Sequence, residues 1–417
     1  ALYFTNARNF FRFGSTLQSI IVKNDIDLAL DEKSLHMHFS LHAVVPAPDT
    51  LFKNIKKVPP GCYLTIDENK KISIIQYWKL ESPEQKNIIT NENDATETIE
   101  YLLKESIEKR LSASDIDVGV LLSGGIDSSM VVALAKEKFP NLKTYSIGFE
   151  DDKEEKGNEF IYSDQVVKKY KTDHKKFIID NSLVLSKLPK AFEAMSEPMV
   201  AQDAVAFYML SELVRKDVKV ILSGQGADEG FAGYFWYNKI NLEKNNHVNF
   251  LKHYVDRNEV ELNEFLNIKF SSNFTNLMVK NKFRDINAET LLGNVLNFDI
   301  TTLVVDDPVK RVDNMTMAWG LEARVPFLDH KLIEASVKID PNIHLKRNGK
   351  NILKIISDKL LPKDVITRKK GYFPMPALKF IRGEYYDFVY DILNSSKCYN
   401  RNLYNKDHIN KLLEKPN

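Results

Sequence analysis

An apolar strand that ends in a small-residue turn and continues into a helix constrains the fold of this chain more than any other feature. The strand reads V-G-V-L-L over residues 118–122, the turn S-G-G-I-D-S-S follows over 123–129, and the helical segment M-V-V-A-L-A comes next. Glycines let the backbone approach a ligand closely, and the amides that begin a helix attract anions. The arrangement predicts a pyrophosphate site in which Asp127 is a magnesium ligand.

This turn differs from the better-known nucleotide loops. It lacks the lysine of G-x-x-x-x-G-K-[ST] and the glycine spacing of a dinucleotide-binding fold. A tight strand-to-helix connection with local capping by Asp127 is the structural alternative. The buried strand before the turn and the apolar helix after it favour a phosphate site instead, and with it ATP chemistry that releases pyrophosphate.

Strands and helices alternate around this turn. A helix is predicted over residues 95–111 before it, and further strands are predicted after it at residues 144–149, 176–179 and 218–222. This alternation predicts an α/β fold with a doubly wound parallel sheet and a site at the carboxyl ends of the strands. From residue 245 onward the chain is mainly helical and rich in aromatic residues.

Residues 1–80 have a different character. Their pattern indicates a hairpin, a short helix and more strand, which is typical of part of an α+β unit. The polar segment 81–94 contains Pro83 and few apolar residues. It is therefore the predicted linker to a second domain over residues 95–417.

A second small-residue turn follows the strand at residues 218–222. It reads S-G-Q-G-A-D-E over residues 223–229. Two such turns at two strand ends can face one nucleotide, and Asp127 and Asp228 would then offer carboxylates to magnesium from opposite sides. Asp228 and Glu229 alone would be interpreted as a solvated loop, so the prediction depends on the pairing of the two turns.

Composition disfavours several classes of function. Lys and Arg total 58 against 57 Asp and Glu, so the chain lacks the bulk positive charge of a nucleic-acid binder. Cys62 and Cys398 lie far apart without paired spacing, which suits a reducing compartment and a cytoplasmic location. No apolar run approaches the roughly 20 residues needed to span a bilayer, so no membrane partner is expected.

Three histidines near residue 40 have a tempting spacing. His38 and His42 are separated by one helical turn, as two metal ligands on one helix face would be, and His36 lies nearby. No acidic or cysteine partner is obvious, so surface or hydrogen-bonded histidines are the preferred interpretation.

Two charged motifs occur later in the chain. The pattern around Arg324 and Asp329 is explained by a structural ion pair between them at least as well as by contacts to substrate. The triplet of Arg368, Lys369 and Lys370 precedes a glycine, and one of these cations would suffice to stabilise negative charge on phosphorus oxygens during adenylyl transfer.

Three segments together resemble the asparagine synthetase family of glutamine-dependent amidotransferases. They are the S-G-G-I-D-S-S turn, the S-G-Q-G-A-D-E turn with Gly233-Tyr234 after it, and G-L-E-A-R-V-P-F-L-D at residues 320–329. The resemblance covers nearly the whole chain. It implies an Ntn-type glutaminase that frees ammonia, followed by a PP-loop ATP pyrophosphatase domain, similar to the adenine nucleotide alpha hydrolases, that activates a carboxylate as an acyl-adenylate.

The resemblance also assigns roles to individual residues. It implies that Asp127 and Asp228 are the metal ligands and that Leu121 or Leu122, together with Ile147, surrounds adenine. The full set implied to bind ATP and magnesium is Leu121, Leu122, Ser123, Gly124, Gly125, Asp127, Ser128, Ser129, Ile147, Ser223, Gly224 and Asp228. Lys370 matches the family's late lysine, which is expected to stabilise charge during adenylation. Lys350 and Lys354 are weaker candidates.

Gln225 is the main departure from the family pattern, which resembles S-G-E-G-x-D-E. An amide can donate and accept hydrogen bonds but cannot take a proton, so a role of this catalytic position as a base is lost. Together with G-Y-F-P-M-P-A-L at residues 371–378, Gln225 is closer to the N-acetylglutaminylglutamine amidotransferase branch. The small-molecule carboxylate acceptor therefore stays open between aspartate and a blocked dipeptide.

Residues 1–80 resemble only the closing part of a glutaminase. By this resemblance the nucleophile is a cysteine at the extreme N-terminus, a place that neither Cys62 nor Cys398 occupies, so the chain is expected to be a fragment without glutaminase activity. Glutamine-derived ammonia is the expected second substrate, and a homodimer stays open. An RNA-modifying enzyme and a non-catalytic regulatory chain are the less favoured alternatives.

Overall fold

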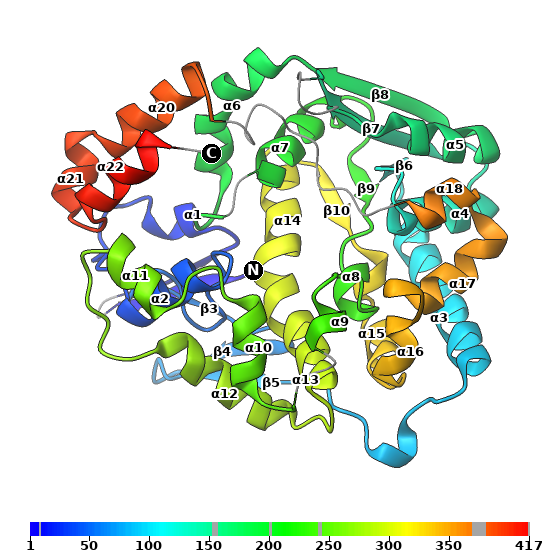
Figure 1. The fold of residues 1–417 in the computed structure, drawn as a ribbon, viewed down its shortest axis with the longest axis horizontal. Helices are drawn as coiled ribbons and strands as arrows, with labels where there is room; N and C mark the ends of the chain where they lie inside the picture. Colours follow the sequence, from blue (N-terminus) through cyan, green and yellow to red (C-terminus); the bar gives the residue numbers. More distant parts are fainter. Residues whose placement is uncertain (8–9, 152–156, 200–201, 241–243, 369–380, 416–417) are drawn as a thin grey trace.

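A five-stranded parallel sheet with helices packed on it lies in the upper right of Figure 1. The computed structural model describes residues 1–7, 10–151, 157–199, 202–240, 244–368 and 381–415. The sheet has the order β10-β9-β6-β7-β8, and its strands are β6 (Val118–Leu121), β7 (Lys143–Phe149), β8 (Asp173–Ile179), β9 (Val220–Leu222) and β10 (Glu322–Arg324). All four pairings between them are parallel, which confirms the predicted α/β sheet.

The strand order creates a natural ligand crevice. β6 comes first in the sequence and lies at the middle, with β7 and β8 added on one side and β9 and β10 on the other. The connections therefore reverse direction between β6 and β9, and doubly wound sheets bind ligands beyond the carboxyl ends of the strands at such a point. Both small-residue turns leave the sheet there, one after β6 and one after β9.

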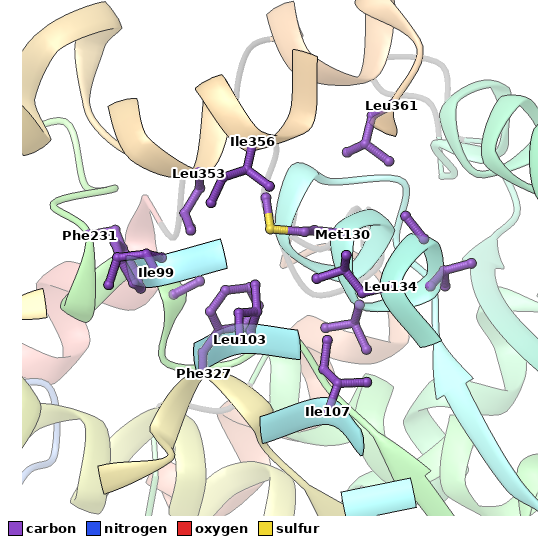
Figure 2. Packing of buried hydrophobic residues seen from close by; sticks show 14 of the residues in the cluster. Ile99, Leu103, Ile107, Met130, Leu134, Phe231, Phe327, Leu353, Ile356 and Leu361 are labelled. Atoms are coloured by element: carbon purple, nitrogen blue, oxygen red, sulfur yellow. The ribbon is translucent and has the colours of Figure 1, made fainter. Parts of the chain in front are cut away.

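Helices cover both faces of the sheet. The first core joins α3 (Glu92–Ser112), α4 (Ile126–Lys138) and α17 (Asn351–Leu360), and Figure 2 shows Leu103, Met130 and Ile356 packed within it. The second core lies on the opposite face, between the sheet and α6 (Asn181–Ala194), α7 (Gln202–Val214) and α14 (Lys310–Met317). Burial on both faces explains why the central strands are apolar without alternation.

Several elements differ from the sequence prediction, including β8, which begins at Asp173 instead of residue 176, and β9, which begins at Val220 instead of residue 218. The helix predicted over residues 95–111 begins at Glu92, because the side chain of Asn91 accepts hydrogen bonds from the amides of Asn93 and Asp94. The predicted linker 81–94 therefore ends inside a helix. Strand β10 was not predicted, since three residues that pair only with β9 give no periodic signal.

The N-terminal segment forms two small antiparallel sheets. β1 (Tyr3–Ala7) pairs with β2 (Phe10–Gly14) and β3 (Lys56–Lys57), while β4 (Cys62–Ile66) and β5 (Ile72–Gln76) form a separate hairpin. Helix α1 (Leu17–Ile21) and helix α2 (Glu32–Ser40) complete the α+β arrangement that was expected. Helix α2 packs on α12 (Phe274–Ile286), so the N-terminal segment contacts the helical part of the chain directly.

The chain from residue 245 onward is mainly helical, as predicted, and contributes an aromatic core that includes Phe250, Tyr254 and Phe298. The helices of the chain not yet named are α5 (Phe160–Tyr170), α8 (Ala227–Gly230), α9 (Tyr237–Ile240), α10 (His247–Tyr254), α11 (Glu259–Phe265), α13 (Leu291–Phe298), α15 (His330–Ser336), α16 (Pro341–Leu345), α18 (Lys363–Thr367), α20 (Glu384–Leu393), α21 (Ser396–Arg401) and α22 (Lys406–Glu414). Two π-helical turns, Asp299–Leu303 and Val305–Val309, connect α13 to α14. Within the described ranges, no helix is both long and apolar enough to cross a bilayer.

Candidate active site

A cavity of about 460 Å³ opens where β6 and β9 end. Both predicted turns contribute to its wall. Among the residues that the resemblance assigned to ATP, magnesium or catalysis, those that line it are Leu121, Leu122, Ser123, Asp127, Ser128, Ile147, Ser223, Gly224, Gln225 and Asp228. The strand order therefore brings together residues that are about a hundred positions apart in the chain.

Hydroxyl groups hold the first turn in shape. Ser128 Oγ accepts a hydrogen bond from the amide of Ser123 at 3.2 Å and lies 3.1 Å from Ser123 Oγ. Ser123 Oγ in turn accepts from the amide of Gly125 at 3.3 Å. Gly125 is the N-cap of α4 and has no side chain, so it cannot accept a hydrogen bond from the first amides of this helix. Such a helix start suits an anion.

The second turn lies directly against the first. A Cβ atom on Gly224 would lie 2.9 Å from the backbone nitrogen of Ser128 and 3.1 Å from Cβ of Asp127, so only glycine permits this approach. Gly226 has a φ of +88° and lies under the side chain of Leu328, which fixes how the turn leads into α8. The two turns thus form one continuous wall.

Lys350 connects the two predicted metal ligands. Its Nζ lies 2.6 Å from Oδ2 of Asp127 and 2.8 Å from Oδ1 of Asp228, and the side chain is only 8% exposed. Burial alone would lower the pKa of Lys350, but the two facing carboxylates outweigh it and raise that pKa. A positive charge therefore lies between the turns, and it belongs to a lysine that the sequence analysis gave only as a weaker candidate than Lys370.

The donor set fits Mg²⁺ bound together with a nucleotide. Asp127 and Asp228 converge from opposite turns on one point, and carboxylate oxygens are the ligands that Mg²⁺ prefers. Within the described residues no group of three or more metal-binding side chains occurs. Mg²⁺ commonly uses one or two carboxylates and completes its shell with waters and phosphate oxygens, so the two aspartates match that pattern.

Several predicted residues lie elsewhere. Gly124 and Gly125 shape the first turn without being part of the cavity wall, and Ser129 is completely buried in α4. Lys354 donates to the backbone oxygen of Arg347, away from the cavity wall. Lys370 lies outside the described residues.

Arg368 is the described member of the basic triplet, and it does line the cavity. Its Nη2 lies 2.8 Å from Oε2 of Glu159, and its guanidinium carbon lies 4.7 Å from the ring centre of Tyr162. The cation is therefore fixed by an acidic partner and an aromatic ring. The sequence pointed to this triplet, but not to the partners that position Arg368.

A further group of charged residues from elements other than the two turns also lines the cavity, and of these His42 alone was discussed from the sequence. We call this group the distal end and define it by Asp203, Asp307, Arg311 and His42. Arg311 donates through Nη1 to Asp203 at 2.6 Å and through Nη2 to Asp307 at 2.7 Å. Helical spacing was the available signal, because Asp203, Phe207 and Leu210 lie on one face of α7 and all line the cavity.

The expected pairing of Arg324 with Asp329 is wrong. Nε of Arg324 lies 2.7 Å from Oε1 of Glu322, and Asp329 pairs with Arg110 at 3.1 Å. Arg324 also donates to the backbone oxygen of Arg110, and Asp329 caps α15 by accepting from the amide of Lys331, so both side chains bind to α3 instead of to each other. Both ion pairs are structural, as the sequence interpretation favoured, but the partners differ.

The three histidines do not share a helix face. Helix α2 ends at Ser40, and His42 has a φ of +49°, so His38 and His42 diverge. His36 is buried between Thr275 at 2.8 Å and Glu259 at 2.7 Å, which confirms the hydrogen-bonded interpretation. Acidic partners do exist, since His42 Nδ1 lies 2.7 Å from Asp256, but they come from distant segments and could not be identified from local sequence.

Comparisons with known proteins agree with this geometry. A family model described as asparagine synthase matches residues 98–417, and one described as a glutamine amidotransferase domain matches residues 1–78. Asparagine synthetase [glutamine-hydrolyzing] 1 of Bacillus subtilis is 28% identical over 454 residues, covering 99% of this chain and 69% of that protein. Asparagine synthetase [glutamine-hydrolyzing] 3 of the same organism is 28% identical over 396 residues, covering 89% of this chain and 62% of that protein.

A solved structure of an NH3-dependent NAD synthetase from Campylobacter jejuni is 14% identical and covers 34% of this chain and 61% of that chain. Its TM-score of 0.24 is too low to support an argument. The asparagine synthase model, in contrast, spans far more than half of the sequence. The chain therefore belongs to the asparagine synthase family.

Proposed function

We propose that this chain is an ATP-dependent ligase that activates a small carboxylate as an acyl-adenylate, releases pyrophosphate and forms an amide with ammonia. One observation carries the proposal. Two small-residue turns meet at the switch point of the sheet, and their carboxylates, Asp127 and Asp228, converge on the buried cation of Lys350. A nucleotide whose phosphates lie along this wall would meet helix amides, a metal site and a lysine at once.

The nucleotide would lie with its phosphates on the first turn. The open N-terminus of α4 and the hydroxyls of Ser123 and Ser128 supply donors for pyrophosphate oxygens. Gly124 and Gly125 give the turn its shape, and Ser223 and Gly224 close it from the second strand. The apolar side chains of Leu121, Leu122 and Ile147 line the same cavity and supply a surface for adenine.

Asp127 and Asp228 would hold Mg²⁺, which supplies positive charge to the phosphate oxygens when it is bound. Lys350 is kept protonated by the same carboxylates, so it can neutralise charge as the bond between the α and β phosphates breaks. We propose Lys370 as a second cation for this step, on the resemblance of its segment to the family. Pyrophosphate leaves with the bonding electrons, and the acceptor carboxylate is joined to the adenylyl group.

Gln225 would contact the reacting acyl group but could not accept the proton that leaves ammonia. It lines the cavity on the second turn, between Gly224 and Gly226. In the second step ammonia attacks the acyl carbon, AMP leaves with the electron pair, and one proton leaves the nitrogen. An amide side chain can hydrogen bond to the acyl oxygen or to ammonia, but the proton must pass to another acceptor such as water or AMP.

The test measures pyrophosphate, AMP and ADP in a reaction with ATP, Mg²⁺ and candidate carboxylates. Ammonium chloride serves as nitrogen donor, which makes the result independent of any glutaminase. We expect acceptor-dependent pyrophosphate and AMP in equal amounts, and a loss of at least about 100-fold in Asp127→Asn. The control is Asp164→Asn, which removes an exposed partner of Lys176 outside the cavity wall. Formation of ADP and phosphate, or unchanged turnover in Asp127→Asn, would contradict the proposal.

A further inference from the structure

A second cavity, of about 310 Å³, lies between helix α2 of the N-terminal segment and helix α12. We call it the α2–α12 cavity. We propose that it binds a small organic anion, a monocarboxylate with a short apolar body, and that Lys282 holds the carboxylate. This inference is independent of the proposed function, because none of the residues that line the α2–α12 cavity lines the candidate active site.

One face of each helix forms a wall of this cavity. On α12, Phe274, Met278 and Lys282 follow one another at intervals of four residues, so they share one helix face. Met37 of α2 lines the cavity from the N-terminal segment, and the loop over residues 46–49 contributes a third side. The wall therefore combines apolar side chains with one lysine from α12.

The two helices are held together beside the cavity. Thr275 of α12 lies with its Oγ1 2.8 Å from Nδ1 of His36 and 2.6 Å from Oγ of Ser40, both in α2. Met37 belongs to a buried apolar cluster on which Met278 packs. These contacts fix the separation of the two walls, so the cavity exists before a ligand enters it, as is usual for ligand sites.

Lys282 is a half-buried cation without a protein counter-ion at short range. Within the described part of the chain, its amino group makes no hydrogen bond or ion pair. Burial lowers the pKa of Lys282, and the carboxylate of Asp285 opposes this effect without cancelling it. An ammonium group in such a place gains from an anion that enters from solution.

The acids on the cavity wall are already paired with other cations. Asp49 lies 2.6 Å from Nζ of Lys33 and 3.0 Å from Nζ of Lys56. Asp285 lies 3.6 Å from Nε of Arg284. Neither carboxylate therefore depends on Lys282 for its charge balance.

The charges around the cavity favour an anion with one negative charge. The wall and its direct ion-pair partners carry four cations, Lys282 among them, against two carboxylates. Asn281, the residue before Lys282, also lines the cavity and can donate through its side-chain amide. One ammonium group and one amide match the two oxygens of a carboxylate, whereas a phosphate group has three acceptor oxygens and up to two charges.

The apolar part of the wall defines the rest of the ligand. Phe274, Leu277 and Pro46 line the cavity together with Met37 and Met278. Methionine side chains are unbranched and flexible, so they adapt to an aliphatic chain. A volume of about 310 Å³ lies at the small end of the range of roughly 300–1,000 Å³ for ligand pockets. A short chain such as that of hexanoate therefore suits it.

The experiment titrates the full 417-residue chain with hexanoate, hexanamide and acetate, and follows the methionine methyl signals by NMR. Hexanamide keeps the apolar body without the charge, and acetate keeps the charge without the body. Met37 and Met278 report on the α2–α12 cavity, whereas Met315 is buried in the second core beside the sheet and reports changes elsewhere. Met37→Leu and Met278→Leu assign the two reporter signals.

We expect saturable shifts of the Met37 and Met278 signals with hexanoate and an unchanged Met315 signal. Hexanoate should bind about 10-fold more tightly than hexanamide, because hydrogen bonds to a charged group are stronger than those between neutral groups. It should bind at least about 50-fold more tightly than acetate, since each buried methylene strengthens binding about four-fold.

Substitutions then assign the preference to Lys282. Lys282→Met should weaken hexanoate binding about 10-fold and leave hexanamide binding unchanged, while Lys282→Arg, which keeps the charge, should keep the preference. Lys280→Met is the matched control, because Lys280 is exposed on the same helix and outside the cavity wall. Hexanoate should also raise the unfolding temperature of the parent chain and of Lys280→Met more than that of Lys282→Met.

Each outcome has a defined meaning. Equal affinities for hexanoate and hexanamide, or a preference that persists in Lys282→Met, would overturn the role of Lys282. Titrations without saturable shifts at Met37 and Met278 would overturn the site itself. Loss of the preference in Lys282→Met together with its retention in Lys282→Arg would uphold the inference, because a folding defect would not depend on the charge at this position.

Discussion

The two ends of the active-site cavity are built in different ways. At the end where the two turns meet, which we call the nucleotide end after its proposed ligand, backbone geometry defines the site, since short turns follow two strands and glycines allow the turns to touch. At the distal end, side chains define it, because Asp203, Arg311 and His42 come from three segments that only tertiary packing brings together. Arg311 and Asp203 alone are 108 residues apart in the chain.

This difference implies different sensitivities. A turn held by local hydrogen bonds should respond to changes in its own backbone and tolerate changes elsewhere. A charged cluster held by packing should depend on the contacts behind it, including those from the N-terminal segment. Substitutions at the two ends should therefore change the free energy of unfolding by different amounts.

The largest effect is expected from Lys57, which lies behind the distal end. Its buried Nζ lies 2.7 Å from Asp306 and 3.2 Å from Glu197, and Asp306 directly precedes Asp307. Lys57→Met keeps the length of the side chain but leaves the more distant Lys310, at 3.7 and 3.9 Å, as the only described cation paired with the two buried carboxylates. We expect the free energy of unfolding to fall by about 3–5 kcal/mol, as measured by urea denaturation.

Lys33→Met is the matched control, because this lysine also pairs with an aspartate but is 47% exposed. Its effect should stay within about 1 kcal/mol. If the distal end depends on packing, Lys57→Met should also raise the KM for the acceptor more than the KM for ATP. Equal destabilisation by the two substitutions would show that the buried network is not what holds the N-terminal segment in place.

A smaller effect on unfolding is expected from Gly124, at the nucleotide end. Gly124 has a φ of +75°, and a Cβ there would lie 2.6 Å from the backbone nitrogen of Ser163. Gly383 has a φ of +54° with no heavy atom within 4 Å of the added Cβ. Both Gly→Ala substitutions incur the strain of a positive φ, about 1 kcal/mol or more, but only Gly124→Ala adds a clash with backbone.

We therefore expect the free energy of unfolding of Gly124→Ala to be about 2 kcal/mol lower than that of Gly383→Ala. The rate of pyrophosphate release by Gly124→Ala should fall about 10-fold, because the turn must shift. Thermal or urea unfolding together with the pyrophosphate assay measures both quantities. An active Gly124→Ala enzyme with the stability of Gly383→Ala would mean that the turn adapts freely, which would weaken the contrast between the two ends.

The same contrast explains what the sequence could predict. Strand, turn and helix follow one another within residues 118–135, so local patterns were enough to predict the α/β sheet and most of the nucleotide end. Asp228 could be added because its turn repeats that pattern after another strand. Lys350 precedes α17 in a left-handed conformation, outside any such pattern, and only the structure shows that it joins the two aspartates.

The distal end could not be predicted for a physical reason. Asp307 lies one helical turn before Arg311, but Asp203 and Asp256, the other partner of Arg311 and the partner of His42, come from distant segments and leave no trace in local periodicity. The error at Arg324 and Asp329 has the same cause, since closeness in sequence suggested a pair that the fold does not make. Strand β10 was missed because three residues are too few to show a pattern.

The smallest expected effect concerns Asp299, which begins the π-helical stretch leading to Asp307. Burial raises the pKa of Asp299 to about 8, although Tyr237 donates a hydrogen bond to it at 2.6 Å. The unfolded chain loses this proton near pH 4, so between about pH 4 and 8 the folded state holds more protons. The free energy of unfolding therefore falls as the pH rises through this range.

Asp299→Asn should remove that dependence while its amide oxygen still accepts from Tyr237. We expect the variant to gain about 1.4 kcal/mol relative to the parent chain between pH 5 and pH 6, measured by urea denaturation at each pH. The exposed Asp164→Asn should keep the slope of the parent chain. A variant that is less stable than the parent at pH 8 would show that the fold needs Asp299 in its ionised form. The helical stretch behind the distal end would then tolerate a buried negative charge without a lysine beside it, whereas the aspartates of the nucleotide end are paired with Lys350.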